Sequence, residues 1–348
     1  MNKFIHYEAV NTKIRALESR FLKEEDFNNL LNKKGINEIA AYLKNETHYK
    51  SVLHDIDENK IHRGELEILI RKDHVKQIGK LIFYFNNNYK KFFRYVFLKR
   101  EIEDLKKVLR SIKNGKISSL NRESFAHLGQ FSGIRVDSLL SSKTIDDFIL
   151  SLKGTEYYSY LLPLEEEKGE KNIFLGEMVL DLAYFDIFYK TLESLNKNDK
   201  KIIDELQGTS VDLLNIQWIY RGINYYNMPR ELLFNYTIPH GHILSVRDIK
   251  ELCYCTGLKE FEDKILNTKY NFLFDNENTK NMFMERRSLR YQYYIVKKLK
   301  KRHRMDILEA IAFDVLLEFE IRDIITVIES IRYDMPLDEA KKFLVRKL

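Results

Sequence analysis

The sequence predicts an all-α protein built from three similar helical domains, and three observations support this fold class. Only four of the 348 residues are proline, so long uninterrupted helices are permitted almost everywhere. Apolar residues recur at helical spacing in the segments between loops. Three short sequence markers also occur three times each, in the same order and at nearly constant spacing.

The first marker is an amphipathic helix that ends in Thr-x-Tyr. It occurs as INEIAAYLKNETHY, IDDFILSLKGTEY and LKEFEDKILNTKY, beginning at Ile36, Ile145 and Leu258. Each copy starts with an aliphatic residue and continues with apolar residues on one helical face. The threonines are Thr47, Thr155 and Thr268, separated by 108 and 113 residues, and the tyrosines are Tyr49, Tyr157 and Tyr270.

The second marker is an acidic residue followed three positions later by another acid or an amide. The copies are Glu101 with Asp104, Asp212 with Asn215, and Glu320 with Asp323. An apolar stripe at helical spacing follows each of them, and Gly115 is a plausible stop for the first helix. Since Asn215 cannot relay a proton, we interpret the acids as a helix start that complements the macrodipole or binds a neighbouring base, and not as a catalytic pair.

The third marker is a glutamate between the other two. Glu67, Glu177 and Glu285 precede the second marker by 34, 35 and 35 residues. Together the markers indicate three helical units of about 110 residues, the usual size of a compact domain. Gly, Asn and Pro near Lys116 and Pro229 set the boundaries, giving domains 1–116, 117–228 and 229–348. Three similar units suggest a pseudo-threefold arrangement, with AHLGQFSGIRV and NYTIPHGHILS as the clearest loops.

Composition indicates a folded protein without a membrane span. The chain is 44% hydrophobic and 32% charged, with a net charge of +6 that does not by itself require an anionic partner. No signal core opens it, and MVLDLAYFDIFY, its most apolar run, is too short to cross a bilayer. Cys253 and Cys255 supply too few ligands for zinc and too few pairs for a disulfide framework, so we expect reduced thiols in or near a core.

The search for catalytic motifs is negative. The chain has no phosphate-binding P-loop, dinucleotide fingerprint, zinc-protease helix or nucleophile elbow. His240 and His242 around Gly241 could form half a metal site, but no acid or cysteine stands close by in sequence, so we interpret them as a Pro-Gly turn. We expect no catalytic residue, cofactor or metal. An unrecognised hydrolase that uses these histidines is one alternative.

Two basic runs are candidate binding segments. The first, NYKKFFRYVFLKR, carries Lys90, Lys91, Arg94, Lys99 and Arg100; the second, VKKLKKRHR, carries Lys297, Lys298, Lys300, Lys301, Arg302 and Arg304. Basic residues between aromatics can grip single-stranded nucleic acid or anionic lipid headgroups. We favour solvated helix faces whose aromatics form core, and keep a nucleic-acid-binding helical repeat protein as the alternative. Residues 297–302 of the second run are our candidates for a protein partner contact.

The order of these segments resembles the C subunit of the bacterial and archaeal V-type (A-type) ATPases, the homologue of the eukaryotic vacuolar ATPase d subunit. The resemblance covers essentially the whole chain. It is carried by VNTKIRALESRFLKEEDFNNLL, LKNETHY, HRGELE and EIEDLKKVLRSIKNG in the first copy, and by YTIPHGHIL and EFEIRDIITVIESIRYDMP in the third. One departure is Glu329, which stands where Arg110 and Arg221 stand in the other copies.

The resemblance implies an all-helical funnel of three domains with pseudo-threefold symmetry. It implies a non-catalytic rotor part at the cytoplasmic face of the membrane, with no transmembrane span of its own and no nucleic-acid partner. The closed end is expected to sit on the proteolipid ring, and the open mouth to receive the D and F subunits of the central stalk. Such a part would transmit torque between ATP chemistry and the movement of H+ or Na+.

Overall fold

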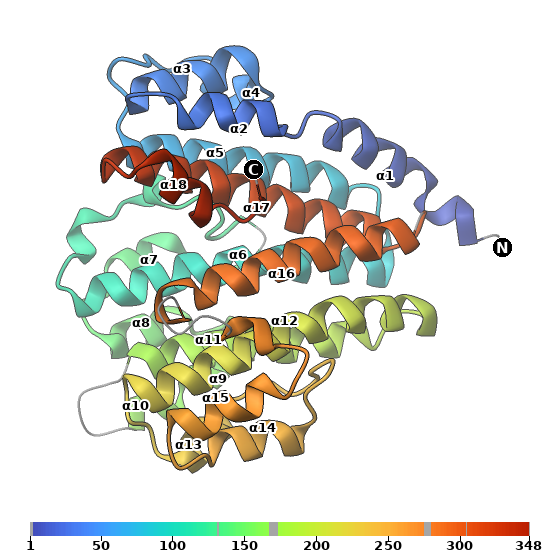
Figure 1. Ribbon diagram of the computed structural model, residues 1–348, viewed down its shortest axis with the longest axis vertical. Coiled ribbons are helices and arrows are strands. Elements are labelled where there is room, and N and C mark those ends of the chain that lie inside the picture. Colours follow the sequence, from blue (N-terminus) through green and yellow to red (C-terminus); the bar gives the residue numbers. More distant parts are fainter. Residues whose placement is uncertain (1–2, 131, 167–172, 275–279, 304, 348) are drawn as a thin grey trace. The chain divides into compact units, whose positions relative to one another are not determined.

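The computed structural model describes residues 3–130, 132–166, 173–274, 280–303 and 305–347. Within these ranges the chain forms helices and loops and no β-strand, so the predicted all-α class is confirmed (Figure 1). The chain divides into two compact units: unit 1 comprises Met1–Ser194 with Met305–Leu348, and unit 2 comprises Leu195–Arg304. The division into domains 1–116, 117–228 and 229–348, and their funnel arrangement, stay predictions.

Unit 1 contains both ends of the chain. Its α-helices are α1 (Lys3–Glu18), α2 (Glu24–Leu31), α3 (Ile36–Glu46), α4 (Lys50–Leu53), α5 (Arg63–Ile82), α6 (Asn87–Lys113), α7 (Val136–Leu140), α8 (Ile145–Ser151), α9 (Tyr158–Leu161), α10 (Pro163–Glu166), α11 (Ile173–Leu192), α17 (Leu308–Arg332) and α18 (Leu337–Phe343). Two 3-10 turns, η1 (Ile117–Ser119) and η2 (Arg122–Ser124), follow α6. Helix α17 packs against α5, α1 and the short helices α2 and α3, so the last long helix lies among the first ones (Figure 1).

Helices α6 and α11 form the other main contact of unit 1. Helix α6 has 27 residues without a proline and buries an apolar stripe that includes Phe92, Leu105 and Leu109. It ends at Lys113, and Gly115 follows with φ of 63°, a conformation that glycine adopts without strain, so the predicted stop is confirmed. Helix α11 is buried on several sides, which explains why MVLDLAYFDIFY is apolar nearly all round.

Unit 2 contains α12 (Lys197–Asn224), α13 (Arg230–Asn235), α14 (Val246–Cys253), α15 (Leu258–Leu266), η3 (Asn271–Leu273) and α16 (Lys280–Arg302). Helix α12 packs against α14, α15 and α16. The two free cysteines, Cys253 and Cys255, are buried as expected.

The three amphipathic helices of the Thr-x-Tyr marker are present as α3, α8 and α15. An acid near the start of each helix accepts a hydrogen bond from a backbone N–H four residues earlier. The donors and acceptors are Lys34 with Glu38 (3.1 Å), Lys143 with Asp147 (3.0 Å) and Thr256 with Glu260 (2.8 Å). Because free N–H groups at a helix start need acceptors, this repeated bond fixes the same helix beginning three times.

Candidate functional site: three repeated junctions and a basic helix face

Each threonine of the Thr-x-Tyr marker closes the helix that precedes it. Its hydroxyl donates to a backbone carbonyl at the end of that helix: Thr47 to Leu43 (2.6 Å), Thr155 to Leu152, the residue that follows α8 (2.7 Å), and Thr268 to Ile265 (2.7 Å). In the first and third copies the same oxygen accepts the backbone N–H of the tyrosine. The threonine therefore orients the chain where the tyrosine ring enters the core.

The tyrosine of each first marker then donates its hydroxyl to the leading acid of a second marker. We call these pairs junction 1 (Tyr157 with Glu101, 3.2 Å), junction 2 (Tyr270 with Asp212, 2.7 Å) and junction 3 (Tyr49 with Glu320, 3.1 Å). All three acids are buried, with at most 1% of their surface exposed. Junctions 1 and 3 lie in unit 1, and junction 2 lies in unit 2.

The interpretation of these acids as helix starts is wrong. Glu101, Asp212 and Glu320 lie in the interiors of α6, α12 and α17, several turns after each helix begins. Their carboxylates serve backbone N–H groups of other segments and not those of their own helices. A buried carboxylate needs such donors, and a loop needs acceptors for its free N–H groups, so each satisfies the other.

The donors differ between the junctions, but in each junction they lie on the loop that precedes a short helix: α7, α14 or α2. In junction 1, Oε2 of Glu101 accepts the N–H of Gly129 at 3.0 Å and the hydroxyl of Ser132 at 2.5 Å. In junction 2, Oδ2 of Asp212 accepts the N–H groups of His242 (3.1 Å), Ile243 (2.7 Å) and Leu244 (3.4 Å). In junction 3, Oε2 of Glu320 accepts the N–H of Leu22 at 2.7 Å.

The second residue of the same marker also binds backbone. Asp104 accepts the N–H groups of His127 and Leu128 at 2.9 Å each. Asn215 accepts the N–H of Ile238 at 2.9 Å and donates to its carbonyl at 2.8 Å. An amide can do this as well as a carboxylate, which explains why Asn215 replaces an acid in the middle copy.

Junction 3 is assembled from the two ends of the chain. Asp323 accepts the N–H of Val345 at 2.5 Å and Nε of Arg346 at 2.9 Å. The same guanidinium donates to the carbonyl of Leu22 at 3.0 Å and stacks on Phe27, with its carbon 3.9 Å from the ring centroid. Arg346 thus ties the C-terminal tail to the N-terminal segment, where copies 1 and 2 use one continuous loop.

Burial raises the pKa of all three junction acids above the ordinary carboxyl value. Their hydrogen-bond donors oppose this rise, and for Glu320 the charges of His48 and Arg346 oppose it more strongly. For Glu101 the pKa is raised to about 7. Burial likewise raises the pKa of Tyr49, Tyr157 and Tyr270, and the neighbouring carboxylate adds to the effect. The tyrosines therefore remain protonated donors.

Ion pairs connect the glutamates of the third marker to the preceding copy. Nε of Arg110 on α6 lies 2.5 Å from Glu177 on α11, and Arg221 on α12 lies 3.5 Å from Glu285 on α16. The two arginines occupy the same place in their copies. The glutamate marker is therefore explained by a partner about 65 residues earlier in the chain.

The corresponding contact in the third copy differs in two ways: a glutamate replaces the arginine, and an additional arginine takes part. Helix α17 has Glu329 in place of the arginine, and Glu67 is the corresponding glutamate on α5. Arg63, one turn before Glu67, forms ion pairs with both carboxylates, its Nε lying 3.3 Å from Glu67. Burial raises the pKa of Glu67, Arg63 opposes that rise, and Glu329 adds to it. Arg63 therefore compensates for the sequence departure at Glu329.

A buried ionic cluster in unit 1 was not found by sequence analysis. Asp314 lies 2.9 Å from Nε2 of His74 and 3.1 Å from Arg100, and Glu318 lies 3.2 Å from Nε of Arg100. Burial opposes ionisation of Glu318, but Arg100 and two further arginines outweigh it and hold its pKa well below the usual range. The pairs join residues more than 200 positions apart, so no local pattern marks them.

The candidate partner-binding residues lie on the last turns of α16 in unit 2. Lys297, Lys298, Lys301 and Arg302 are exposed, whereas Val296 and Leu299 are buried. Lys297 donates to the hydroxyl of Tyr293 at 3.1 Å. Within the described residues Lys298, Lys301 and Arg302 have no acidic partner. Arg304, the last basic residue of the run, lies outside the described residues.

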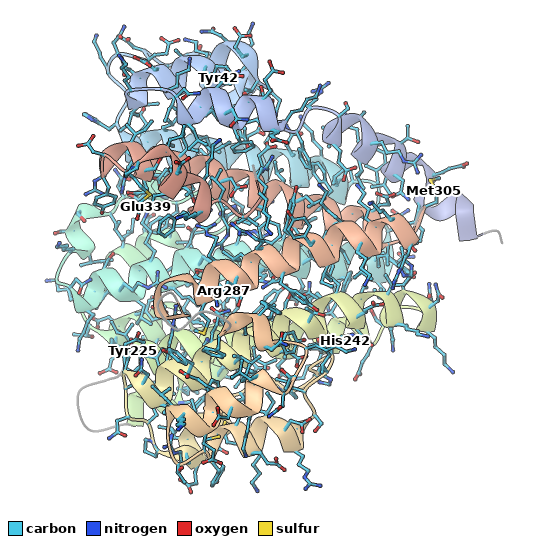
Figure 2. The ribbon with its side chains drawn as sticks, viewed as in Figure 1. Tyr42, Tyr225, His242, Arg287, Met305 and Glu339 are labelled. Carbon is cyan, nitrogen blue, oxygen red and sulfur yellow. The ribbon has the colours of Figure 1, made fainter. Side chains whose placement is uncertain are left out.

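The same helix continues the positive charge toward its start. Arg287, in the middle of Figure 2, donates to the carbonyls of Phe272 at 3.2 Å and Leu273 at 3.1 Å. No acid occurs between residues 286 and 302. We call the exposed side chains of residues 297–302 the basic face of α16; their role in binding a partner stays a prediction.

The first basic run is divided between core and surface. Phe92, Phe93 and Phe97 are buried, which leaves these rings no face for stacking on bases. Lys91 and Arg94 are exposed, in agreement with a solvated helix face. Arg100 differs, because it is buried in the ionic cluster.

His240 and His242 lie on the loop between α13 and α14, as the sequence indicates. Figure 2 labels His242. The loop is held to α12 by the backbone N–H of His242, which donates to Asp212. Within the described part of the chain, no three His, Cys, Asp or Glu side chains are grouped so that they could hold a metal ion. The same part contains no helix long and apolar enough to cross a membrane.

Comparison with known proteins gives consistent matches. The family model of the ATP synthase (C/AC39) subunit matches residues 10–343. The chain is 26% identical to the A-type ATP synthase C subunit of Methanosarcina mazei, over 76% of this chain and 71% of that protein. It is 22% identical to the C subunit of Methanocaldococcus jannaschii (97% and 86% covered) and 20% identical to that of Thermococcus kodakarensis (98% and 91%).

Proposed function

This chain belongs to the ATP synthase (C/AC39) subunit family, and on that premise we propose that it is a non-catalytic central-rotor subunit of a V-type (A-type) ATPase. It links the D and F subunits of the central stalk to the proteolipid ring at the cytoplasmic face of the membrane. It transmits torque for the ATP-coupled transport of H+ or Na+. The observation that carries the proposal is the family match from residue 10 to residue 343.

The junctions support a mechanical role. A torque-transmitting part needs helices that keep their positions under load, and a buried hydrogen bond to a carboxylate fixes position more strictly than apolar packing does. Each long helix α6, α12 and α17 carries such a bond in its interior. The same hydrogen bond at three equivalent places stiffens the wall of the proposed funnel in each repeat.

The basic face of α16 supports a partner contact. Its exposed cations Lys298, Lys301 and Arg302 lack acidic partners within the described residues, so a facing acidic surface would gain attraction without displacing an internal ion pair. We assign this contact to the stalk D–F complex or to the cytoplasmic loops of the ring.

The test is binding of the purified chain to recombinant D–F complex and to detergent-solubilised proteolipid ring. We expect a stable complex with at least one of them. Failure to bind either, under conditions in which the M. mazei relative binds its own partners, would overturn the proposal. Binding to single-stranded nucleic acid that weakens steeply with salt would favour the alternative of a nucleic-acid-binding repeat protein.

A further inference from the structure

The middle position of the Thr-x-Tyr marker differs between the three copies. It is His48 in the first copy, Glu156 in the second and Lys269 in the third. The first copy contributes its tyrosine to junction 3, which is assembled from the two ends of the chain. Junction 3 therefore has an imidazole where the markers of the other two junctions have a carboxylate or an amine.

One ring nitrogen of His48 is bound to the backbone of the N-terminal segment. The side chain of His48 is 8% exposed, and its Nδ1 lies 2.9 Å from the carbonyl oxygen of Arg20. Because a carbonyl oxygen can only accept, Nδ1 carries the hydrogen of this bond. In a neutral ring the other nitrogen, Nε2, then has a lone pair and no hydrogen.

Two buried carboxyl groups face Nε2 of His48. Oε1 of Glu320 on α17 lies 3.6 Å away, and Oδ2 of Asp73 on α5 lies 3.8 Å away. These distances are too long for hydrogen bonds but suit ion pairs. A neutral Nε2 would turn its lone pair toward two acceptor oxygens, whereas the N–H of an imidazolium would be attracted by both. Tyr49, whose ring centroid lies 4.1 Å from that of His48, donates to Glu320 and brings no charge of its own.

The buried charges around junction 3 balance better with a proton on His48. Asp73, Glu320 and Asp323 are buried carboxyl groups without measurable exposure. Within the described residues Arg346 is the only arginine or lysine at ion-pair distance from any of them, 2.9 Å from Asp323. Burial raises the pKa of Glu320, and the charge of His48 opposes that rise more strongly than that of Arg346. Since carboxylates buried without cations are costly, a second cation beside Arg346 is expected.

We propose that His48, Asp73 and Glu320 form a proton-binding site that ties the N-terminal segment to α5 and α17. The proton sits on Nε2 of His48 and gives the ring a positive charge between the two carboxylates, while Nδ1 holds the carbonyl of Arg20. Loss of the proton leaves the carboxylates without this cation, so the attachment of the N-terminal segment at junction 3 weakens as the pH rises. The inference rests on these contacts and does not depend on the proposed function.

The site should make the stability of the chain depend on pH in a defined range. A free imidazole loses its proton near about pH 6.5, so above this value the folded chain holds a proton that the unfolded chain has released. Such a group contributes its full stabilisation below that pH, and the contribution is lost as the pH rises further. This range lies above that of Glu101, whose contribution is lost between pH 4.5 and about 7.

The first test compares the parent chain with His48→Gln in denaturant unfolding at about pH 6 and about pH 8.5. Because glutamine does not titrate, the ratio of the two unfolding constants isolates the proton at His48. We expect this ratio to change at least about fivefold between the two pH values, with the parent favoured at the lower one. The control His54→Gln, whose side chain is 62% exposed, should change it less than about twofold. A change in His48→Gln as small as that of the control would overturn the inference.

The second test uses the parent chain and so does not require a variant that folds. Nuclear magnetic resonance of the chain with isotope-labelled histidine reports which ring nitrogens carry a hydrogen, and the contact with the Tyr49 ring identifies the signal of His48. At about pH 7.5 we expect both nitrogens of His48 to carry a hydrogen, whereas a free imidazole is mostly neutral there. A His48 ring with a single hydrogen at this pH would overturn the inference.

Discussion

Tyr49 donates its hydroxyl to Oε1 of Glu320 at 3.1 Å, although 271 residues separate them in the chain. The tyrosine belongs to the first sequence copy and the acid to the third. Its ring and the carboxylate are fully buried. The marker tyrosine of each sequence copy therefore bonds the long helix of another copy, and not the long helix of its own copy.

We expect Tyr49→Phe to destabilise the protein by about 1–3 kcal/mol, because it removes a donor from a buried carboxylate without changing the shape of the core. Tyr157→Phe and Tyr270→Phe should act in the same direction. Denaturant unfolding measures the change, with Tyr84→Phe, a 42% exposed ring, as the control. A Tyr49→Phe variant as stable as the parent would contradict the structural role of junction 3.

Stability should fall as pH rises through the titration of Glu101. Its pKa is about 7 in the folded chain against an ordinary value of 4.5, so the folded state holds the proton more tightly than the unfolded state. The free energy of unfolding therefore decreases between about pH 4.5 and pH 7 and then levels off. Glu101→Gln removes this contribution, and its stability relative to the parent should rise by about 2 kcal/mol from pH 5 to pH 8. A pH-independent difference would show that burial does not shift this carboxyl.

The link at Glu329 can be restored to the pattern of the other copies. Arg63→Ala leaves Glu67 and Glu329 facing each other, and we expect a loss of about 1 kcal/mol, the usual scale for half-exposed ion pairs. Adding Glu329→Arg recreates an arginine opposite Glu67 and should recover most of that loss. Thermal unfolding of the single and double variants measures the loss of stability and its recovery. A double variant less stable than Arg63→Ala alone would refute the compensation.

Gly241 has no room for a side chain. A Cβ there would lie 2.6 Å from the carbonyl oxygen of Leu244 and still closer to Oδ1 of Asp212. Gly241→Ala should push the loop off α12 and cost about 1–3 kcal/mol. Gly64→Ala is the matched control, since its Cβ would meet nothing within 4 Å. Equal unfolding midpoints for the two variants would contradict the close contact in junction 2.

Charge reversal on the basic face of α16 should separate binding from folding. In Lys298→Glu/Lys301→Glu both side chains are exposed, so we expect an unchanged unfolding midpoint and at least about tenfold weaker association with the D–F complex or the ring. Lys60→Glu/Lys143→Glu makes the same charge change elsewhere and should bind normally. Equal weakening by both pairs would indicate a net-charge effect and not a specific contact.

Local sequence patterns predicted the helices and the repeat, because the Thr-x-Tyr marker and the Glu101-type acids are short-range motifs at regular intervals. They did not predict the partners of these residues. The acid at Glu101 looks the same whether it begins a helix or receives Tyr157 in the middle of one. The sequence exposed Glu329 as a departure, but Arg63 could be recognised as its compensation only when α5 and α17 were seen together.

Arg346 has a consequence for biosynthesis. Chains emerge from the ribosome N-terminus first, and segments fold as their partners become available. Junctions 1 and 2 have all their residues once position 270 has been made. Junction 3 waits for Glu320, and its link to Leu22 waits for Arg346. The N-terminal helices α2 and α3 therefore stay without their final support until Arg346 has been made, long after junctions 1 and 2 can form, and a nascent chain that stops before Arg346 leaves Leu22 without this bond.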